Sequence, residues 1–192
     1  MEHAARLTQA MVSAITPESA PTPDDAQLVC EARGGSRVAF SELYARYARI
    51  VHAILLARVP YGEAEDLVQE VFVIAFQKIA SLREPKALGG WLAAIARRCA
   101  TDYHRAAFRE NAAKREAAHG QPAEPEANAF HVLQAVQTLP EAYRESLTLR
   151  LVAGLTGPEI AERIGLTPDS VRVNLFRGMK MLRERLRGLD KV

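Results

Sequence analysis

A stretch without large apolar side chains divides this chain of 192 residues into two parts. Between Ala106 and Ala129 the sequence is rich in Ala, Glu, Arg and Gln, contains one glycine and two prolines, and has almost no large apolar residue after Phe108. Such a segment cannot bury a core of its own and is typical of a linker. The sequence therefore predicts an N-terminal extension over residues 1–21, small domains over residues 22–106 and 129–192, and a flexible linker over residues 107–128.

Apolar residues recur at steps of three and four positions in both parts, which is the period of amphipathic helices. The longest series runs from Val38 to Leu55 and is expected to end at Pro60-Tyr61-Gly62. No segment shows the sustained alternation of apolar and polar residues that is typical of strands. The predicted fold class is all-α, with a helix from a capping Thr22 to about Ala32, a long helix from Val38, and further helices over residues 63–80, 88–110, 129–138, 141–153, 158–164 and 168–187.

Composition excludes several classes of protein. Lys and Arg number 25 against 23 for Asp and Glu, so the net charge of +2 cannot by itself drive binding to nucleic acid or membrane, and a basic site must come from local clustering. Cys30 and Cys99 lie far apart without a close Cys/His pattern, which argues against a disulfide scaffold or zinc site and fits a reducing cytoplasm. No apolar run approaches the roughly 18 residues of a membrane span, and residues 1–14 lack the features of a signal peptide.

The segment from Thr156 to about residue 187 carries the signals of a helix-turn-helix. Thr156 and Glu159 have capping-box spacing, and Gly165 can adopt the positive φ of a tight turn. In the second helix one side is predicted to face inward, with Val171, Leu175, Gly178 and Leu182, and the other outward, with Ser170, Val173, Asn174, Arg177 and Lys180. A basic outer face suits docking in the DNA major groove, and an ordinary hairpin with a solvated charged surface is the alternative. Val173 and Phe176 lie outside the apolar stripe, and either touch thymine methyls or pack on something outside the motif.

Residues 63–76 contain four acidic residues and no basic one. On a helix, Leu67, Val71, Ile74 and Ala75 share the inner side, while Asp66, Gln69, Glu70 and Val73 share the outer side. Lone valines do occur on solvated faces. The alternative is a protein-binding surface, with an apolar centre rimmed by acids, that suits a basic partner.

The helix over residues 88–110 has the opposite character. Its inner side is predicted to carry Trp91, Leu92, Ile95, Cys99 and Tyr103, and its outer side Arg97, Arg98, Thr101, His104 and Arg105. Cys99 is thus expected to be a small buried hydrophobe and not a sensor thiol. A basic stripe is often only solvated surface, but the preceding Gly89-Gly90 permits close approach of a ligand backbone.

These features together resemble a known family. Residues 25–105 are similar to the second conserved region of bacterial sigma factors, most specifically in Ala64–Phe72 and Gly90–Arg98, and residues 139–186 look like the fourth region, including Gly154-Leu155 and Glu159-Ile160-Ala161. Only the linker separates the two matches, so the third region of larger sigma factors is missing. The chain therefore resembles the two-domain, extracytoplasmic-function sigma factors.

The resemblance implies three sets of site residues. The clamp helices of core RNA polymerase would be bound by Asp66, Leu67, Gln69, Glu70, Phe72 and Val73. The minus-ten promoter element would be bound by Lys86, Trp91, Arg97, Arg98, Thr101, His104 and Arg105. The minus-thirty-five element would be read by Ser170, Arg172, Val173, Asn174, Arg177 and Lys180, with the same domain binding the polymerase flap.

The expected function is that of a cytoplasmic, non-enzymatic transcription initiation factor that needs no metal or cofactor, directs core RNA polymerase to promoters and assists DNA melting. Its partners would be core polymerase, double- and single-stranded promoter DNA and, by resemblance, an anti-sigma protein. A ligand-responsive helix-turn-helix repressor or activator is the alternative; no P-loop, nucleophile elbow or metal-ligand spacing supports an enzyme. The linker further predicts that the domains change their separation and that neither DNA-binding face is covered by the other domain.

Overall fold

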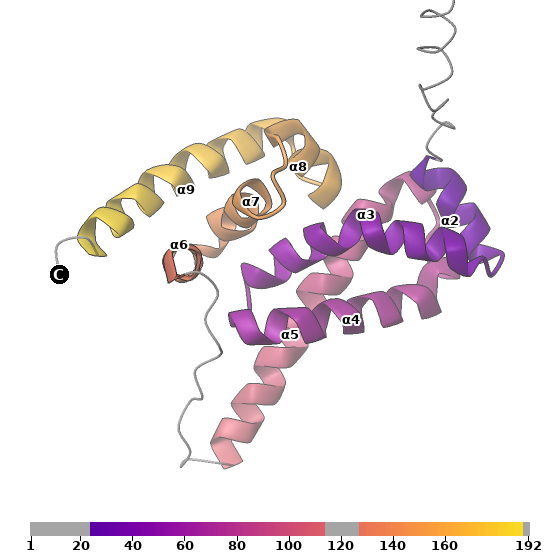
Figure 1. Cartoon of the computed structure of the whole chain (residues 1–192), viewed down its shortest axis with the longest axis horizontal. Coiled ribbons are helices and arrows are strands. Elements are labelled where there is room, and N and C mark those ends of the chain that lie inside the picture. The colour runs from indigo at the N-terminus through magenta and orange to yellow at the C-terminus, as the bar shows by residue number, and fades with distance from the viewer. Residues whose placement is uncertain (1–23, 114–126, 190–192) are drawn as a thin grey trace, which may run out of the picture.

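The computed structural model describes residues 24–113 and 127–189, and the regular elements within these ranges are helices (Figure 1). This confirms the predicted all-α fold class. The first domain consists of α2 (Asp25–Arg33), α3 (Arg37–Leu56), α4 (Tyr61–Lys78) and α5 (Leu88–Ala113), with the short 3₁₀ turns Ile79–Ser81 and Pro85–Ala87 before α5. The second consists of α6 (Ala127–Gln137), α7 (Glu141–Leu151), α8 (Gly157–Ile164) and α9 (Pro168–Leu189).

Polar caps and one glycine determine where the first helices begin. Asp24 caps α2, because its carboxylate accepts hydrogen bonds from the backbone N–H groups of Ala26 and Gln27. The predicted cap, Thr22, lies outside the described residues. Gly35, with a φ of 92°, separates α2 from α3, and Ser36 Oγ then accepts the Ala39 N–H at 3.2 Å.

Pro60 begins a helix where the sequence predicted that one would end. The long helix α3 already ends at Leu56, and Pro60 is the N-cap residue of α4. A proline is well suited to this position because its missing N–H would have no acceptor within the helix. The expectation that Pro60-Tyr61-Gly62 ends the long helix was therefore wrong.

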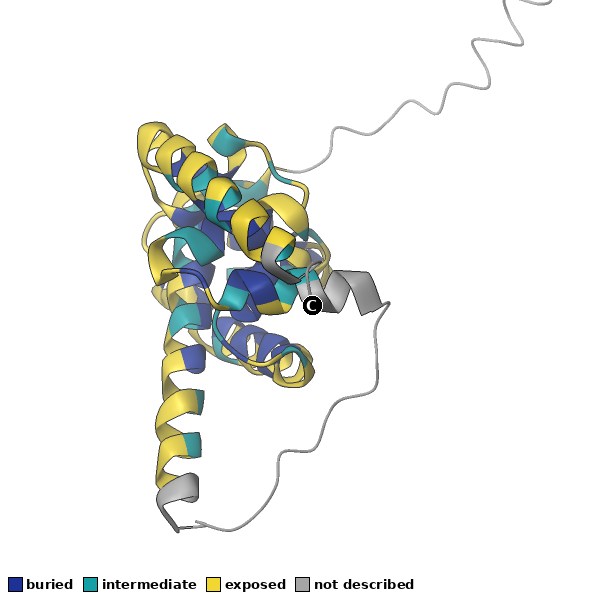
Figure 2. Ribbon diagram, turned by 90° about the vertical axis from the view of Figure 1, so that its left-hand side faces the viewer, coloured by how far each residue is buried: buried dark blue, intermediate teal, exposed yellow. Residues whose placement is uncertain are grey.

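The helices on either side of the predicted linker extend into it. Helix α5 continues to Ala113 and α6 starts at Ala127, so both ends of residues 107–128 are helical. The rest of the predicted linker, residues 114–126, lies outside the described residues, as does the N-terminal extension. The C-terminal part of α5 extends away from the other helices (Figures 1 and 2).

Each domain packs its helices around a central apolar layer (Figure 2). In the first domain α3 packs against α2, α4 and α5, and Val29, Val51, Ile54 and Val71 are fully buried between them. In the second domain α7 and α9 pack together with α6, around a core of Val136, Leu139, Leu147 and Leu182.

The two domains also pack against one another. Helix α3 contacts α7, and α5 contacts α8. Leu149, Ile160 and Val171 of the second domain belong to the same buried cluster as the core of the first domain. Apolar residues of α7 and α8 are therefore buried against the first domain, a contact that the sequence did not predict.

Candidate nucleic-acid and protein interfaces

The outer side of α4 is exposed as the sequence predicted. Asp66, Gln69 and Glu70 are exposed, and Val73 between them is 56% exposed. Two other residues expected at this surface, Leu67 and Phe72, are only 8% and 5% exposed. They hold α4 against the rest of the domain, so they support the surface from beneath and a partner cannot reach most of either side chain.

An apolar groove between α3 and α4 adjoins this surface at Gln69 and Val73. It has a volume of about 350 Å³, and its walls include the rings of Phe40, Tyr44, Phe72 and Phe76 beside Val73. The ring centroids of Phe40 and Phe76 are 5.0 Å apart and those of Tyr44 and Phe72 are 4.6 Å apart. Sequence reasoning missed this groove, although Phe76 follows Val73 by three positions and therefore shares its helix face.

The predicted basic side of α5 is only partly free. Arg98 and Arg105 are exposed and both reach Asp102, at 3.7 and 3.6 Å, and Thr101 is exposed as well. His104 is exposed and its Nε2 lies 2.7 Å from the backbone oxygen of Arg58. Lys86 is exposed just before α5, whereas Trp91 is half-buried against the core.

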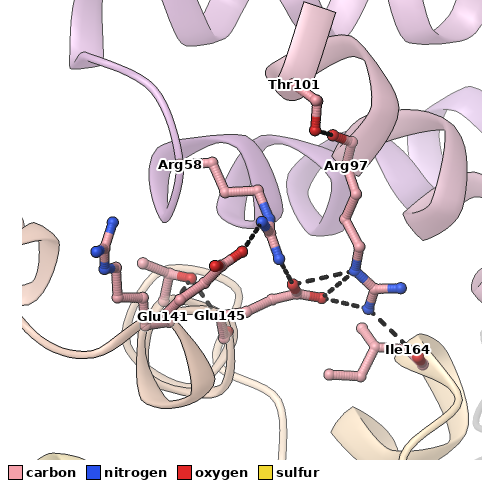
Figure 3. Close-up of polar contacts among 8 residues, drawn as sticks. Arg58, Arg97, Thr101, Glu141, Glu145 and Ile164 are labelled. Atoms are coloured by element: carbon pink, nitrogen blue, oxygen red, sulfur yellow. Dashed lines mark hydrogen bonds and ion pairs between the residues drawn. The ribbon is translucent and has the colours of Figure 1, made fainter. Parts of the chain in front are cut away.

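Arg97 faces the second domain (Figure 3). Its Nη2 lies 2.6 Å from Glu145 Oε1 and its Nε 3.1 Å from Glu145 Oε2. The other domain thus covers a residue that the sequence placed on the free outer side of α5. Glu145 was not singled out from the sequence, because nothing within α7 alone indicates a partner.

The helix-turn-helix is formed by α8 and α9 as predicted. The Glu159 carboxylate accepts the Thr156 N–H at 2.7 Å and the Thr156 hydroxyl at 2.6 Å, and these bonds lower the pKa of Glu159. Gly165 ends α8 with a φ of 70°, and Thr167 Oγ1 accepts the Ser170 N–H at 3.2 Å at the start of α9. The local signals in the sequence therefore predicted this element correctly.

The outer side of α9 remains at the surface except at one position. Residues that are exposed there comprise Ser170, Arg172, Val173, Phe176, Arg177 and Lys180. Phe176 is 73% exposed, so it does not pack on another part of the described chain. Asn174 is half-buried and lines a pocket of about 460 Å³ together with Arg97 and Glu145.

Cys99 is the remaining candidate for a reactive side chain. Cys99 is buried, and burial raises the pKa of its thiol to about 11, so the thiol stays protonated at neutral pH. This agrees with its predicted role as a small core residue.

Within the described residues, no cluster of His, Cys, Asp and Glu side chains could hold a metal ion. The helices described here include none that is both long and apolar enough to cross a membrane.

Known proteins show the same two regions in the same order. Residues 43–110 match the family Sigma-70 region 2, and residues 130–182 match the family Sigma-70, region 4. RNA polymerase sigma factor CarQ of Myxococcus xanthus is 32% identical over 166 residues, which cover 82% of this chain and 95% of that protein. The ECF RNA polymerase sigma-E factor of Escherichia coli K12 is 29% identical over 182 residues, which cover 86% of this chain and 95% of that protein.

Solved structures agree with this assignment. The structure of CnrH in complex with the cytosolic domain of CnrY matches with a TM-score of 0.61 and 25% identity, over 85% of this chain and 97% of that one. The sigma factor RpoE, in complex with the anti-sigma factor NepR from Bartonella quintana, shares the fold with a TM-score of 0.57 at 22% identity, over 77% of this chain and 96% of that one. The chain therefore belongs to the extracytoplasmic-function class of the sigma-70 family, the non-enzymatic transcription initiation factors that direct RNA polymerase to promoters through regions 2 and 4.

Proposed function

We propose that region 2 binds core polymerase through α4 and the minus-ten element through α5, while α9 of region 4 reads the minus-thirty-five element. The observation that supports this proposal is the contrast in charge between the exposed surfaces of α4, α5 and α9. Helix α4 presents acids around an apolar centre, whereas α5 and α9 present mainly arginines and polar groups. An acidic surface repels the DNA backbone and suits a basic protein, and the basic surfaces suit DNA.

The polymerase contact is centred on the groove beside Val73. Asp66, Gln69 and Glu70 would pair with basic and polar groups of the clamp helices, while Val73 and Phe76 bury apolar area in the middle of the contact. Interfaces of this kind obtain most of their affinity from a few central residues, and rim charges act on association and specificity.

The minus-ten contact uses the start of α5 and its outer side. Lys86, Arg98 and Arg105 supply positive charge for the DNA backbone, and Thr101 and His104 supply hydrogen-bonding groups. Bases that leave the duplex during melting stack on aromatic rings. Trp91, in the first turn of α5, is half-buried and would offer one face of its ring for such stacking. Region 2 would thereby hold single-stranded promoter DNA after it opens.

Region 4 reads duplex DNA with α9. Arg177 and Asn174 would reach base edges in the major groove, and Arg172 and Lys180 would contact phosphates nearer the rim. Ser170 and Val173 lie on the same side of α9 and complete the contact. The same region would bind the polymerase flap.

An anti-sigma protein is the proposed regulatory partner. Its support comes from the sigma factor RpoE, whose solved structure contains the anti-sigma factor NepR. The exposed surface from Asp66 to Val73 and Phe176 of α9 offer apolar anchors for such a partner. Binding there would compete with core polymerase.

The polymerase contact is tested by reversing charge on α4. The double variant Asp66→Lys/Glu70→Lys should compete for core polymerase at least about tenfold more weakly than the parent in a fluorescence competition assay. The matched control is Glu31→Lys/Glu84→Lys, which makes the same change of charge at exposed positions away from α4. Equal competition by the α4 variant and the parent would remove α4 from the interface.

A further inference from the structure

Two adjoining hollows form a trough between α3 and α4, which lie side by side in region 2 (Figure 1). The first hollow is the apolar groove described above, which begins at Phe40, and the second is a pocket of about 370 Å³ that ends at His52. Tyr44 and Gln69 line both of them. Because Phe40 and His52 are twelve positions apart on α3, the trough is about 18 Å long.

The trough is apolar at one end and acidic along one side. Val73 and Phe76 at the apolar end are 56% and 49% exposed, so a docked apolar side chain would remove much of their surface from water. Glu65 lines the other end of the trough, and Asp66 and Glu70 are exposed on the same helix, α4. The trough therefore suits a segment that has an apolar face and carries no negative charge.

The first 23 residues, which precede the described part of the chain, contain a segment with these properties. Apolar residues recur there at steps of three and four positions, at Ala4, Leu7, Met11 and Ile15. This spacing would place them on one face of a helix. Residues 3–15 include one arginine and no acid. As a helix, residues 4–15 would be about 18 Å long, which is the length of the trough.

The segment is attached close enough to reach the trough. Asp25, at the start of α2, is fixed to α3 by an ion pair with Arg46 at 3.1 Å, and Arg46 lies within one helical turn of Tyr44. A path halfway round a helix is roughly 17 Å long, because a helix with its side chains is about 10–12 Å wide. Residues 16–23 can span about 26 Å when extended. Ile15 can therefore be placed in the trough.

We propose that residues 4–15 dock as an amphipathic helix in the trough of the same chain, with Met11 and Ile15 among the aromatic rings. An apolar helix face in a groove is a common mode of recognition, and methionine makes favourable contacts with aromatic rings. The short connection keeps the segment at a high effective concentration, so even weak docking is populated. The docked helix covers Val73 and competes with core polymerase, a consequence that rests on the proposed function.

Docking is tested in the full chain, without polymerase, by the reactivity of a thiol placed in the trough. Val73→Cys supplies this thiol, and a maleimide reagent measures how fast it is modified. Cys30→Ser removes the exposed native thiol, whereas Cys99 is buried and can stay. A docked helix covers the new thiol and slows its modification.

The comparison is between two pairs of substitutions in the N-terminal segment. Met11→Asp/Ile15→Asp places charge on the apolar face, and Gln9→Asp/Ser13→Asp makes the same change of charge on the opposite face of the helix. Modification should be at least about fivefold faster in the first variant than in the second, because the rate follows the fraction of undocked protein. Equal rates would overturn the proposal. Protection that increases with protein concentration would also overturn it, since the trough would then hold the segment of a second copy.

The consequence for polymerase is measured with Val73 intact. Met11→Asp/Ile15→Asp should compete for core polymerase at least about threefold more tightly than Gln9→Asp/Ser13→Asp, because its trough is free. Faster thiol modification without tighter polymerase binding would instead contradict the proposed polymerase contact at α4, because the docked helix would then cover a surface that polymerase does not use. The thiol measurement needs no polymerase, so the two failures are distinguishable.

Discussion

His52, on α3, is a half-buried histidine whose ring lacks one hydrogen-bond partner. It lines a pocket with Glu65 and Gln69 of α4, and its Nε2 has no hydrogen-bond partner among the residues that the structure describes. Burial lowers the pKa of His52, and the nearby Glu65 offsets part of this effect. The folded protein therefore favours the neutral ring.

The lowered pKa predicts how stability depends on pH. Because the unfolded chain binds a proton at His52 more readily than the folded chain, the contribution of His52 is complete above about pH 6.5 and declines as the pH falls towards the lower folded value. His52→Gln should flatten the decline in unfolding free energy between about pH 7.5 and pH 5.5. Urea unfolding at both pH values measures this, with His104→Gln at an exposed position as the control. A slope that His52→Gln leaves unchanged would contradict the assignment.

Among the elements, the turn between α8 and α9 depends on one residue. Gly165 has a φ of 70°, a conformation that a side chain disfavours. Gly165→Ala should lower the free energy of unfolding by about 1–2 kcal/mol. Gly157→Ala is the control, since its Cβ would make only an ordinary contact, 4.0 Å from Val171. Equal unfolding free energies for the two variants would show that the turn is not strained by a side chain.

The exposed side of α9 predicts two distinguishable mutant behaviours. Arg177→Ala should lose discrimination at one upstream base pair, by about 1–3 kcal/mol, because a guanidinium on a base edge is sequence-specific. Lys180→Ala should weaken binding to all sequences alike, because a phosphate contact carries no sequence information. Holoenzyme binding to a series of promoter variants separates these effects. An unchanged preference at every upstream base would exclude Arg177 from base reading.

Elements with local signals were the ones that the sequence predicted well. The capping box at Thr156, the turn at Gly165 and the apolar side of α9 are all encoded within a few residues of one another. Pro60 was misplaced because a proline is compatible both with the end of one helix and with the start of the next. The acids of α4 could be predicted from one helix alone, whereas the groove beside Val73 requires Phe40 and Tyr44 from α3.

At the scale of the whole molecule, the sequence could not predict how the two regions meet. Arg97 and Glu145 are 48 positions apart and lie on either side of the predicted linker. Neither residue has a neighbour in the sequence that indicates a partner, and an arginine on an amphipathic helix is usually solvated. The buried cluster that the two domains share forms only when α7 and α8 pack on region 2, and no local signal in the sequence indicates this packing. The sequence therefore led us to expect independent domains.

The proposed roles of regions 2 and 4 in promoter recognition are tested most directly by in vitro transcription with purified core polymerase. With genomic DNA of the source bacterium as template, sequencing the 5′ ends of the transcripts identifies every start site that depends on this protein. We expect starts that are absent without the protein and preceded by two shared sequence elements, with Arg177→Ala relaxing only the upstream element and Arg98→Ala weakening use of the downstream one. Starts that do not require the protein, or an upstream element that is unchanged in Arg177→Ala, would contradict these roles of α9 and α5.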